Sequence, residues 1–183
     1  MRVTWSSSFA VAIGLAILTL TSSPTIVSAE PTDVRPTDAQ YFIDFRSRAG
    51  YVFGHTYIAY GRLNARGQPV EVRYAGIYPL DDGRGLVFGS VIPVAASVRG
   101  LEDDRKATPT SVYRRRITAT QYARLSAAVR RVGATEHPWH LMFYNCNNFA
   151  IEVAQWLGLR APSAMLLPRA FIDELRDLNG RGI

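Results

Sequence analysis

Apolar and polar residues alternate in the stretch that begins at Tyr41, and alternation with a period of two is typical of a half-buried β-strand. Segment 41–45 has this pattern, and segment 51–60 is dense in aromatic and β-branched residues, which also favour a strand. Segment 64–68 contains a glycine and predicts a turn, after which segment 70–78 predicts a third strand. The second and third strands are therefore expected to form a hairpin.

The pattern is less regular in the middle of the chain. Segment 81–83, Asp-Asp-Gly, predicts a turn, and the apolar segment 86–94 predicts a fourth strand. Segment 102–109 is polar and is expected to be a loop. Alternation returns in segment 112–117, which predicts a further strand.

The spacing of apolar residues then changes to that of helices. Thr118 and Gln121 have the spacing of a capping box, and apolar residues follow at helical intervals: Tyr122, Leu125, Val129 and Val132. A second helix is expected to have Asn147 or a near neighbour as its cap and to end at Gly158. Its expected apolar face consists of Phe149, Ala150, Val153, Trp156 and Leu157.

A last helix is predicted from Pro168 to Gly180, because proline suits the first turn of a helix and glycine the residue after its end. Its apolar positions are Phe171, Ile172, Leu175 and Leu178. The chain has no internal repeats. Strands come first and helices follow, so the sequence predicts the α+β class, with an antiparallel sheet packed against helices.

The first residues have the pattern of an export signal. Arg2 is followed by an apolar run over residues 9–20, and segment 1–29 ends in small residues that suit signal peptidase. The apolar run is short for a transmembrane span, and an uncleaved membrane anchor is the alternative. We therefore expect a periplasmic or secreted protein, with segment 30–40 as a flexible lead-in and segment 41–183 as one domain.

The chain is basic, with a formal net charge of +6, and Lys106 is its single lysine among many arginines. A solvated basic surface is the default interpretation, and contact with an anionic envelope polymer or a membrane surface is the alternative. The basic runs, such as 114–116, are short and are not interleaved with aromatic residues that could stack on bases. Nucleic acid is therefore not an expected partner.

Cys146 is the only cysteine, although exported proteins usually hold cysteines in disulfide pairs. It is a buried filler, half of an intermolecular bridge, or a thiol kept free for chemistry. Asn145 and Asn147 on either side suit a helix start, where N–H groups and the helix dipole favour a thiolate. The backbone N–H of Cys146 is also a candidate donor to a developing oxyanion.

A cysteine nucleophile needs a base, and His55, His137 and His140 are the candidates. His55 lies in the second predicted strand, next to a glycine that allows close approach of another segment. His140 lies six residues before Cys146 and could reach either the base side or the oxyanion side of the site. For each histidine, a hydrogen-bonded structural role is the alternative.

Two parts of the chain resemble a known family. Segment 145–149, Asn-Cys-Asn-Asn-Phe, followed by 152–157, resembles the cysteine motif of the PPPDE thiol peptidases. These are permuted papain-fold proteins that include the desumoylating isopeptidases. Segment 55–61, with His-Thr and Tyr-Gly pairs, and segment 73–76 are similar to the family's histidine strand and the strand after it.

The resemblance implies a permuted papain-like domain, related to the wider NlpC/P60-like hydrolases and lecithin–retinol acyltransferase-like proteins. It implies Cys146 as the nucleophile and His55 as its base. It does not extend over segment 79–140. Papain-like sites often include a residue that orients the histidine, for which Glu71, Tyr74 and Asn145 are candidates. Glu71 and Tyr74 lie on opposite faces of a strand, so at most one can point at His55.

Two classes of function follow. The first is an exported cysteine hydrolase that cleaves an amide or thioester through a Cys146 acyl-enzyme, with an envelope peptide, a protein conjugate or a lipid as substrate. An acyltransferase or esterase that acts on lipids is an alternative within this class. The second is a non-catalytic envelope binding module that keeps the cleft. No metal or cofactor is expected, because no His/Cys pair with zinc-site spacing is backed by a second pair.

Overall fold

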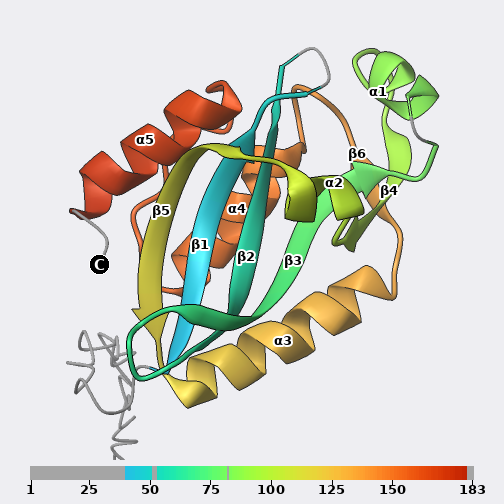
Figure 1. Ribbon diagram of the computed structural model, residues 1–183. Coiled ribbons are helices and arrows are strands. Elements are labelled where there is room, and N and C mark those ends of the chain that lie inside the picture. Colours follow the sequence, from blue (N-terminus) through green and yellow to red (C-terminus); the bar gives the residue numbers. More distant parts are fainter. Residues whose placement is uncertain (1–39, 51–52, 82, 181–183) are drawn as a thin grey trace, which may run out of the picture. The chain divides into compact units, whose positions relative to one another are not determined.

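Figure 1 shows the computed structural model of the chain, which describes residues 40–50, 53–81 and 83–180. Six strands form one antiparallel sheet in the order β5-β1-β2-β3-β4-β6. The strands are β1 Tyr41–Arg48, β2 His55–Leu63, β3 Pro69–Pro79, β4 Val94–Arg99, β5 Pro109–Ile117 and β6 His137–Trp139. The helices are α1 Arg84–Phe88, α2 Glu102–Lys106, α3 Ala119–Gly133, α4 Cys146–Trp156 and α5 Pro168–Asn179. The protein is therefore of the α+β class.

The predicted export signal, residues 1–29, lies outside the described residues, as does the lead-in except for Gln40. Within the described ranges, no helix combines the length and the apolar character needed to cross a membrane.

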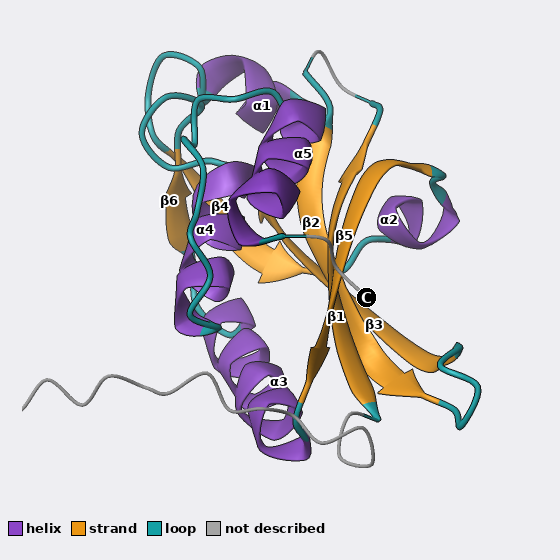
Figure 2. Ribbon diagram, turned by 90° about the vertical axis from the view of Figure 1, so that its left-hand side faces the viewer, coloured by secondary structure: helices purple, strands orange, loops and turns teal. Residues whose placement is uncertain are grey.

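The three long helices α3, α4 and α5 cover one face of the sheet, and the short helix α2 lies on the other face (Figure 2). Residues two apart on a strand share a face, so β1 and β2 present alternate apolar side chains to the helices. Phe45 of β1, Ile58 of β2 and Phe171 of α5 are fully buried in this core. Burial of such a side chain stabilises the fold by roughly 1.5–3 kcal/mol.

The predicted helix ends are confirmed. The N–H of Gln121 donates to Thr118 Oγ1 (3.1 Å) and the N–H of Thr118 donates to Gln121 Oε1 (2.9 Å), which is the reciprocal capping box of α3. Asn145 is the cap of α4, and Pro168 is the first residue of α5. Cys146 is therefore the first residue of α4, which agrees with its predicted place at the helix start, and the cap is Asn145, a near neighbour of Asn147.

The prediction of a strand over 86–94 is wrong. Helix α1 occupies its first part, and the fourth strand, β4, begins only at Val94. Two glycines four residues apart bring α1 close to its neighbours: a Cβ on Gly85 would lie 2.6 Å from the Pro79 side chain, and one on Gly89 would lie 2.4 Å from the Trp139 ring. The apolar run of this segment is typical of a buried strand, but Val87, Phe88, Val91 and Ile92 are exposed.

Two smaller corrections concern polar and apolar positions. The predicted loop 102–109 contains the helix α2, whose Asp104 is completely buried. Trp156, expected on the apolar face of α4, is 46% exposed, and Ala154 is buried instead. The second strand begins at His55, and the start of its predicted range, residues 51 and 52, lies outside the described residues.

The sheet forks between β2 and β3. Their ladder ends at the pair Ile58 and Ala75, and from Gly76 onward β3 pairs with β4 instead. The first residues of β2 therefore lose their neighbour on this side, while β1 still pairs with them on the other. This fork leaves room between β2 and β3 at the level where α4 begins.

Candidate functional site

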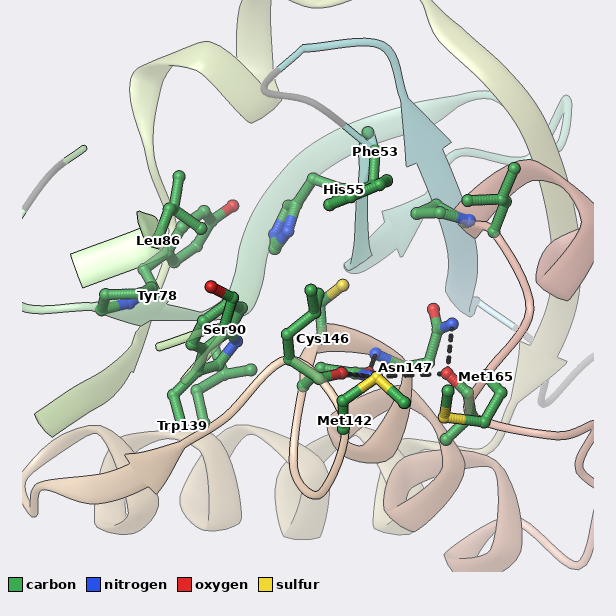
Figure 3. A pocket seen from close by; sticks show the side chains of 18 of the residues that line it. Phe53, His55, Tyr78, Leu86, Ser90, Trp139, Met142, Cys146, Asn147 and Met165 are labelled. Atoms are coloured by element: carbon green, nitrogen blue, oxygen red, sulfur yellow. Dashed lines mark hydrogen bonds between the residues drawn. The ribbon is translucent and has the colours of Figure 1, made fainter. Parts of the chain in front are cut away.

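A cavity of about 760 Å³ opens at the fork of the sheet. Its walls come from the start of β2, the end of β3, helix α1, the segment from β6 to the start of α4, and the loop before α5 (Figure 3). Most of the lining is apolar and includes Phe53, Ile77, Leu86, Trp139, Met142 and Leu166. His55 and Cys146 are both part of this lining.

Asparagine side chains hold the start of α4 in place. Asn145 Oδ1 accepts the N–H of Asn147 (2.8 Å), and Asn145 Nδ2 donates to the carbonyl of Leu141 (2.7 Å). Asn147 Nδ2 donates to the carbonyls of Ala164 (3.0 Å) and Leu166 (2.7 Å). These hydrogen bonds tie the helix start to the loop before α5. Cys146 therefore sits on a rigid corner of the cavity.

A further bond joins this corner to the sheet, since the Thr56 hydroxyl donates to Asn147 Oδ1 (2.6 Å). The hydroxyl group and backbone N–H of Thr56 also lie within hydrogen-bonding reach of the Cys146 sulfur. Because a hydroxyl has one proton, it serves either Asn147 or the sulfur at any one time. The start of β2 thus contributes both to the position of α4 and to the surroundings of the thiol.

Burial raises the pKa of the Cys146 thiol above its usual value. Hydrogen bonds to the sulfur from Thr56, from the N–H of Cys146 itself and from the N–H of Asn147 oppose this rise without cancelling it. The resting thiol is therefore protonated at neutral pH. The N–H of Asn147 donates to Asn145 Oδ1, so the backbone N–H of Cys146 stays the candidate donor to a developing oxyanion.

His55 is the first residue of β2, and only 5% of its surface is exposed. Its ring is tilted against the ring of Tyr78, with centroids 4.4 Å apart. Its Nε2 lies over Gly76, and a Cβ added to Gly76 would be 2.8 Å from this nitrogen. Glycine at the fork therefore leaves the space that the imidazole occupies.

The imidazole of His55 is neutral and has an unused nitrogen. Burial, together with the charge of Arg48, lowers the pKa of His55 to about 3. Within the described part of the chain, Nε2 is buried and has no hydrogen-bond partner. A buried polar atom without a partner typically costs about 1–3 kcal/mol, so most are satisfied in folded proteins.

His55 and Cys146 project into the same cavity from facing walls (Figure 3). No hydrogen bond joins the two side chains among the described residues. The structure thus brings together the two residues that the sequence singled out, one with an unused nitrogen and one with a protonated thiol. It does not pair them directly.

The predicted orienting residues lie elsewhere. Glu71 accepts hydrogen bonds from Arg73 (3.0 Å) and from the hydroxyl of Tyr122 (3.4 Å). Tyr74 is on the opposite face of β3, as expected, and its ring contacts Tyr57. Neither Glu71 nor Tyr74 is among the ring or hydrogen-bond contacts of His55 in the described residues.

Tyr78, which sequence reasoning missed, makes this contact. It lies two residues beyond Gly76 on the same face of β3, so strand alternation could have identified it. Its hydroxyl donates to the buried carboxylate of Asp104, which also accepts from Arg48 Nε (2.8 Å). Burial and the charge of Asp104 raise the pKa of Tyr78 far above its usual value, so it stays a phenol.

The other two histidines have structural hydrogen bonds. His140 Nδ1 accepts the N–H of Met142 (3.1 Å), and the backbone of His140 closes a turn with Tyr144. His140 is not among the residues that line the cavity. His137 Nε2 contacts the carbonyl of Val132 (3.0 Å), away from the cavity. Asn145 lines the cavity, but its amide is committed to backbone carbonyls.

The geometry places a thiol and a neutral imidazole on the wall of one largely apolar cavity, and these are two groups that acyl-transfer chemistry can use. In the described part of the chain, no group of three or more histidine, cysteine and acidic side chains is placed to hold a metal ion. Comparisons with protein-family models, with curated proteins and with solved structures found no match to this chain.

Proposed function

We propose that this protein is a cysteine-dependent acyl hydrolase, with Cys146 as nucleophile and His55 as general base, in an arrangement of the permuted papain-like type. One observation carries the proposal: His55, whose buried Nε2 has no partner in the described part of the chain, lines the same cavity as the thiol at the start of α4. An unpaired buried nitrogen is costly, so its retention beside a thiol favours a role in proton transfer over a role in packing.

The reaction would begin from a neutral pair. As the Cys146 sulfur attacks the carbonyl carbon of the substrate, its proton moves to Nε2 of His55. The carbonyl oxygen takes the negative charge, which the backbone N–H of Cys146 at the start of α4 would stabilise. The imidazolium then gives the proton to the leaving group, and an acyl-enzyme thioester remains. Water attacks this thioester with His55 again as base, which releases the acid and restores the thiol.

We propose an amide or thioester as the bond attacked and a place of action outside the cytoplasm. The export pattern of residues 1–29 supports that place of action. An envelope peptide, a protein conjugate and a lipid all fit this chemistry. The basic net charge of +6 favours work near anionic envelope polymers or a membrane surface.

A second candidate, a non-catalytic binding module, is favoured by one observation. The low pKa of His55 and the raised pKa of Cys146 describe a resting pair without charge or hydrogen bond. A cavity of this kind could bind an apolar ligand and leave it unchanged. In that case the thiol and the imidazole would be part of the wall only.

Turnover by variants of the full chain separates the two candidates. The substrates are N-acetylcysteamine thioesters with acetyl, octanoyl and palmitoyl groups, and intact-mass spectrometry detects the acyl-enzyme. Cys146→Ser is expected to reduce turnover by about 10³-fold or more, and His55→Gln by about 10²-fold or more.

His137→Gln is the matched control, because it replaces a histidine outside the cavity and should leave turnover within about twofold of the wild type. Melting temperatures show whether each variant is folded. Equal turnover by the wild type and Cys146→Ser, or acylation of neither at any chain length, would support the binding module instead.

A further inference from the structure

We infer that the cavity binds a long, unbranched acyl chain, so that the group accepted by Cys146 is the fatty acyl group of a thioester or an ester. The part of this inference that concerns the reaction rests on the proposed function. The part that concerns binding stands on the cavity alone.

Four polar side chains in the wall already hydrogen-bond within the protein. Asn145 and Asn147 donate to backbone carbonyls, and the Tyr78 hydroxyl donates to Asp104. The Ser90 hydroxyl donates to the carbonyl of Val87 (2.6 Å). The other polar side chains of the wall are the solvent-exposed carboxylate of Asp81, the imidazole of His55 and the thiol of Cys146. The rest of the enclosed surface offers aliphatic, aromatic and thioether groups.

This lining suits an acyl chain better than a peptide. Each residue of an extended peptide brings an N–H and a carbonyl, and each of these groups loses about 1–3 kcal/mol if it is buried without a partner. An acyl chain has one polar group, at its end, and that end would lie beside Cys146. A methylene gains about 0.8 kcal/mol on burial, so the chain itself would supply the binding energy.

The size of the cavity agrees with this occupant. If a methylene fills about the volume that a water molecule has in the liquid, roughly 30 Å³, a palmitoyl chain needs about 500 Å³. The cavity has about 760 Å³. The remaining volume leaves room for the thioester or ester and for part of its leaving group.

Exposed apolar side chains continue from the cavity onto the surface. Among the described residues, ten large apolar side chains are more than half exposed, and all but Val70 lie on the segments that form the cavity wall. These segments are 87–92, 142–143 and 165–167, together with Phe53. Large exposed apolar patches are rare on soluble proteins and mark interaction sites. A substrate with an acyl chain would enter across this apolar rim.

The reaction balances without a further reagent. A bond forms between the Cys146 sulfur and the acyl carbon, and the bond from that carbon to the substrate's sulfur or oxygen breaks. His55 carries the thiol proton to the departing sulfur or oxygen, which leaves as a thiol or an alcohol. Water then cleaves the acyl-enzyme to give the fatty acid and the free thiol of Cys146.

Binding is tested with the full chain carrying Cys146→Ala, so that no turnover occurs. Dansyl-undecanoic acid is the probe, and saturated fatty acids of increasing length displace it. Each added methylene should tighten binding about fourfold until the cavity is full, the fold-change that follows from about 0.8 kcal/mol.

Met165→Glu places a charge on an exposed residue of the wall and should weaken probe binding about tenfold or more. Val70→Glu is the matched control, because this residue is also exposed and lies outside the wall, and it should change binding less than twofold. Affinity that does not depend on chain length, or equal losses in the two variants, would overturn the inference.

Turnover separates the inference from the proposed function and identifies the source of the chain. The two substrates are a peptide with a palmitoylated cysteine and phosphatidylcholine in vesicles. Faster acylation of Cys146 by palmitoyl than by acetyl thioesters supports the inference. If the peptide is the better substrate, the acyl chain comes from a lipidated protein, and if phosphatidylcholine with palmitoyl chains is better, it comes from a membrane lipid. Length-dependent binding without acylation would sink the proposed function but keep the acyl-chain site. Equal acylation by acetyl and palmitoyl groups, or cleavage of an unacylated peptide in preference to both palmitoyl substrates, would keep the proposed function but overturn the acyl-chain site.

Discussion

Two polar clusters lie next to each other at the fork of the sheet, and they are built in opposite ways. In the first, the carboxylate of Asp104 accepts hydrogen bonds from both Arg48 and Tyr78. In the second, the imidazole of His55 and the thiol of Cys146 face one cavity without bonding to each other. Tyr78 belongs to both, since its hydroxyl reaches Asp104 while its ring contacts His55.

The comparison shows that two groups at similar depth can differ in the partners they have. Asp104 and His55 are both buried, but the carboxylate lies against the guanidinium of Arg48, whereas burial and the charge of Arg48 lower the pKa of the imidazole. A satisfied cluster stabilises the fold and has nothing to offer a ligand. An unsatisfied one costs stability, and under the proposed function its imidazole would serve as a base.

Removal of the Asp104 carboxylate should have the largest effect on stability. Asp104→Ala leaves the guanidinium of Arg48 buried without this carboxylate and is expected to lower the free energy of unfolding by about 3–5 kcal/mol. Asp173→Ala breaks a half-exposed pair with Arg176 and should cost at most about 1 kcal/mol. Urea unfolding at pH 7 measures both. Equal losses in the two variants would mean that the buried cluster is no more important than a surface pair.

The unsatisfied cluster should make stability depend on pH. The pKa of His55 is lowered from 6.5 to about 3 in the folded protein, so below pH 6.5 the unfolded chain binds a proton that the folded protein does not. The contribution of His55 is therefore present above pH 6.5 and is lost as the pH falls. Between pH 7 and pH 4.5, this loss amounts to about 2–3 kcal/mol.

His55→Gln removes the titrating group, so its free energy of unfolding should fall less between pH 7 and pH 4.5 than that of the wild type. The difference between the two slopes, measured by urea unfolding, isolates His55 from the carboxylates that titrate in the same range. A variant as sensitive to pH as the wild type would show that the imidazole is charged, and therefore partnered, in the folded protein.

The framework could be predicted from the sequence because its signals are local. Alternation identified β1, and capping spacing identified α3 together with the start of α4. The prediction of a strand over 86–94 was wrong because an apolar run does not show whether its side chains face a core or solvent. The prediction of a loop over 102–109 missed the buried Asp104, because its partners Arg48 and Tyr78 are distant in sequence.

Of the candidate site, the sequence singled out two side chains that meet at one cavity, but it could not predict how they are placed. Cys146 stood out by its helix start, and His55 by its strand and by the family resemblance. That the two share a cavity depends on the fork between Ala75 and Gly76, where β3 stops pairing with β2 and begins to pair with β4. No local pattern encodes this exchange. The charge states of both groups depend on burial, which is likewise a property of the whole fold.

The smallest expected effect tests whether the fork is shaped around the imidazole. A Cβ on Gly76 would meet His55 Nε2 at 2.8 Å and the Tyr78 ring at 3.1 Å, so Gly76→Ala should cost about 1–2 kcal/mol of stability through overpacking. In a His55→Ala background the nearest of these contacts is gone, and the same substitution should cost about 1 kcal/mol less. Urea unfolding of the four proteins of this double-mutant cycle gives the coupling energy. Additive effects would place the strain at Tyr78 alone, and the glycine would then serve the satisfied cluster instead of the unsatisfied one.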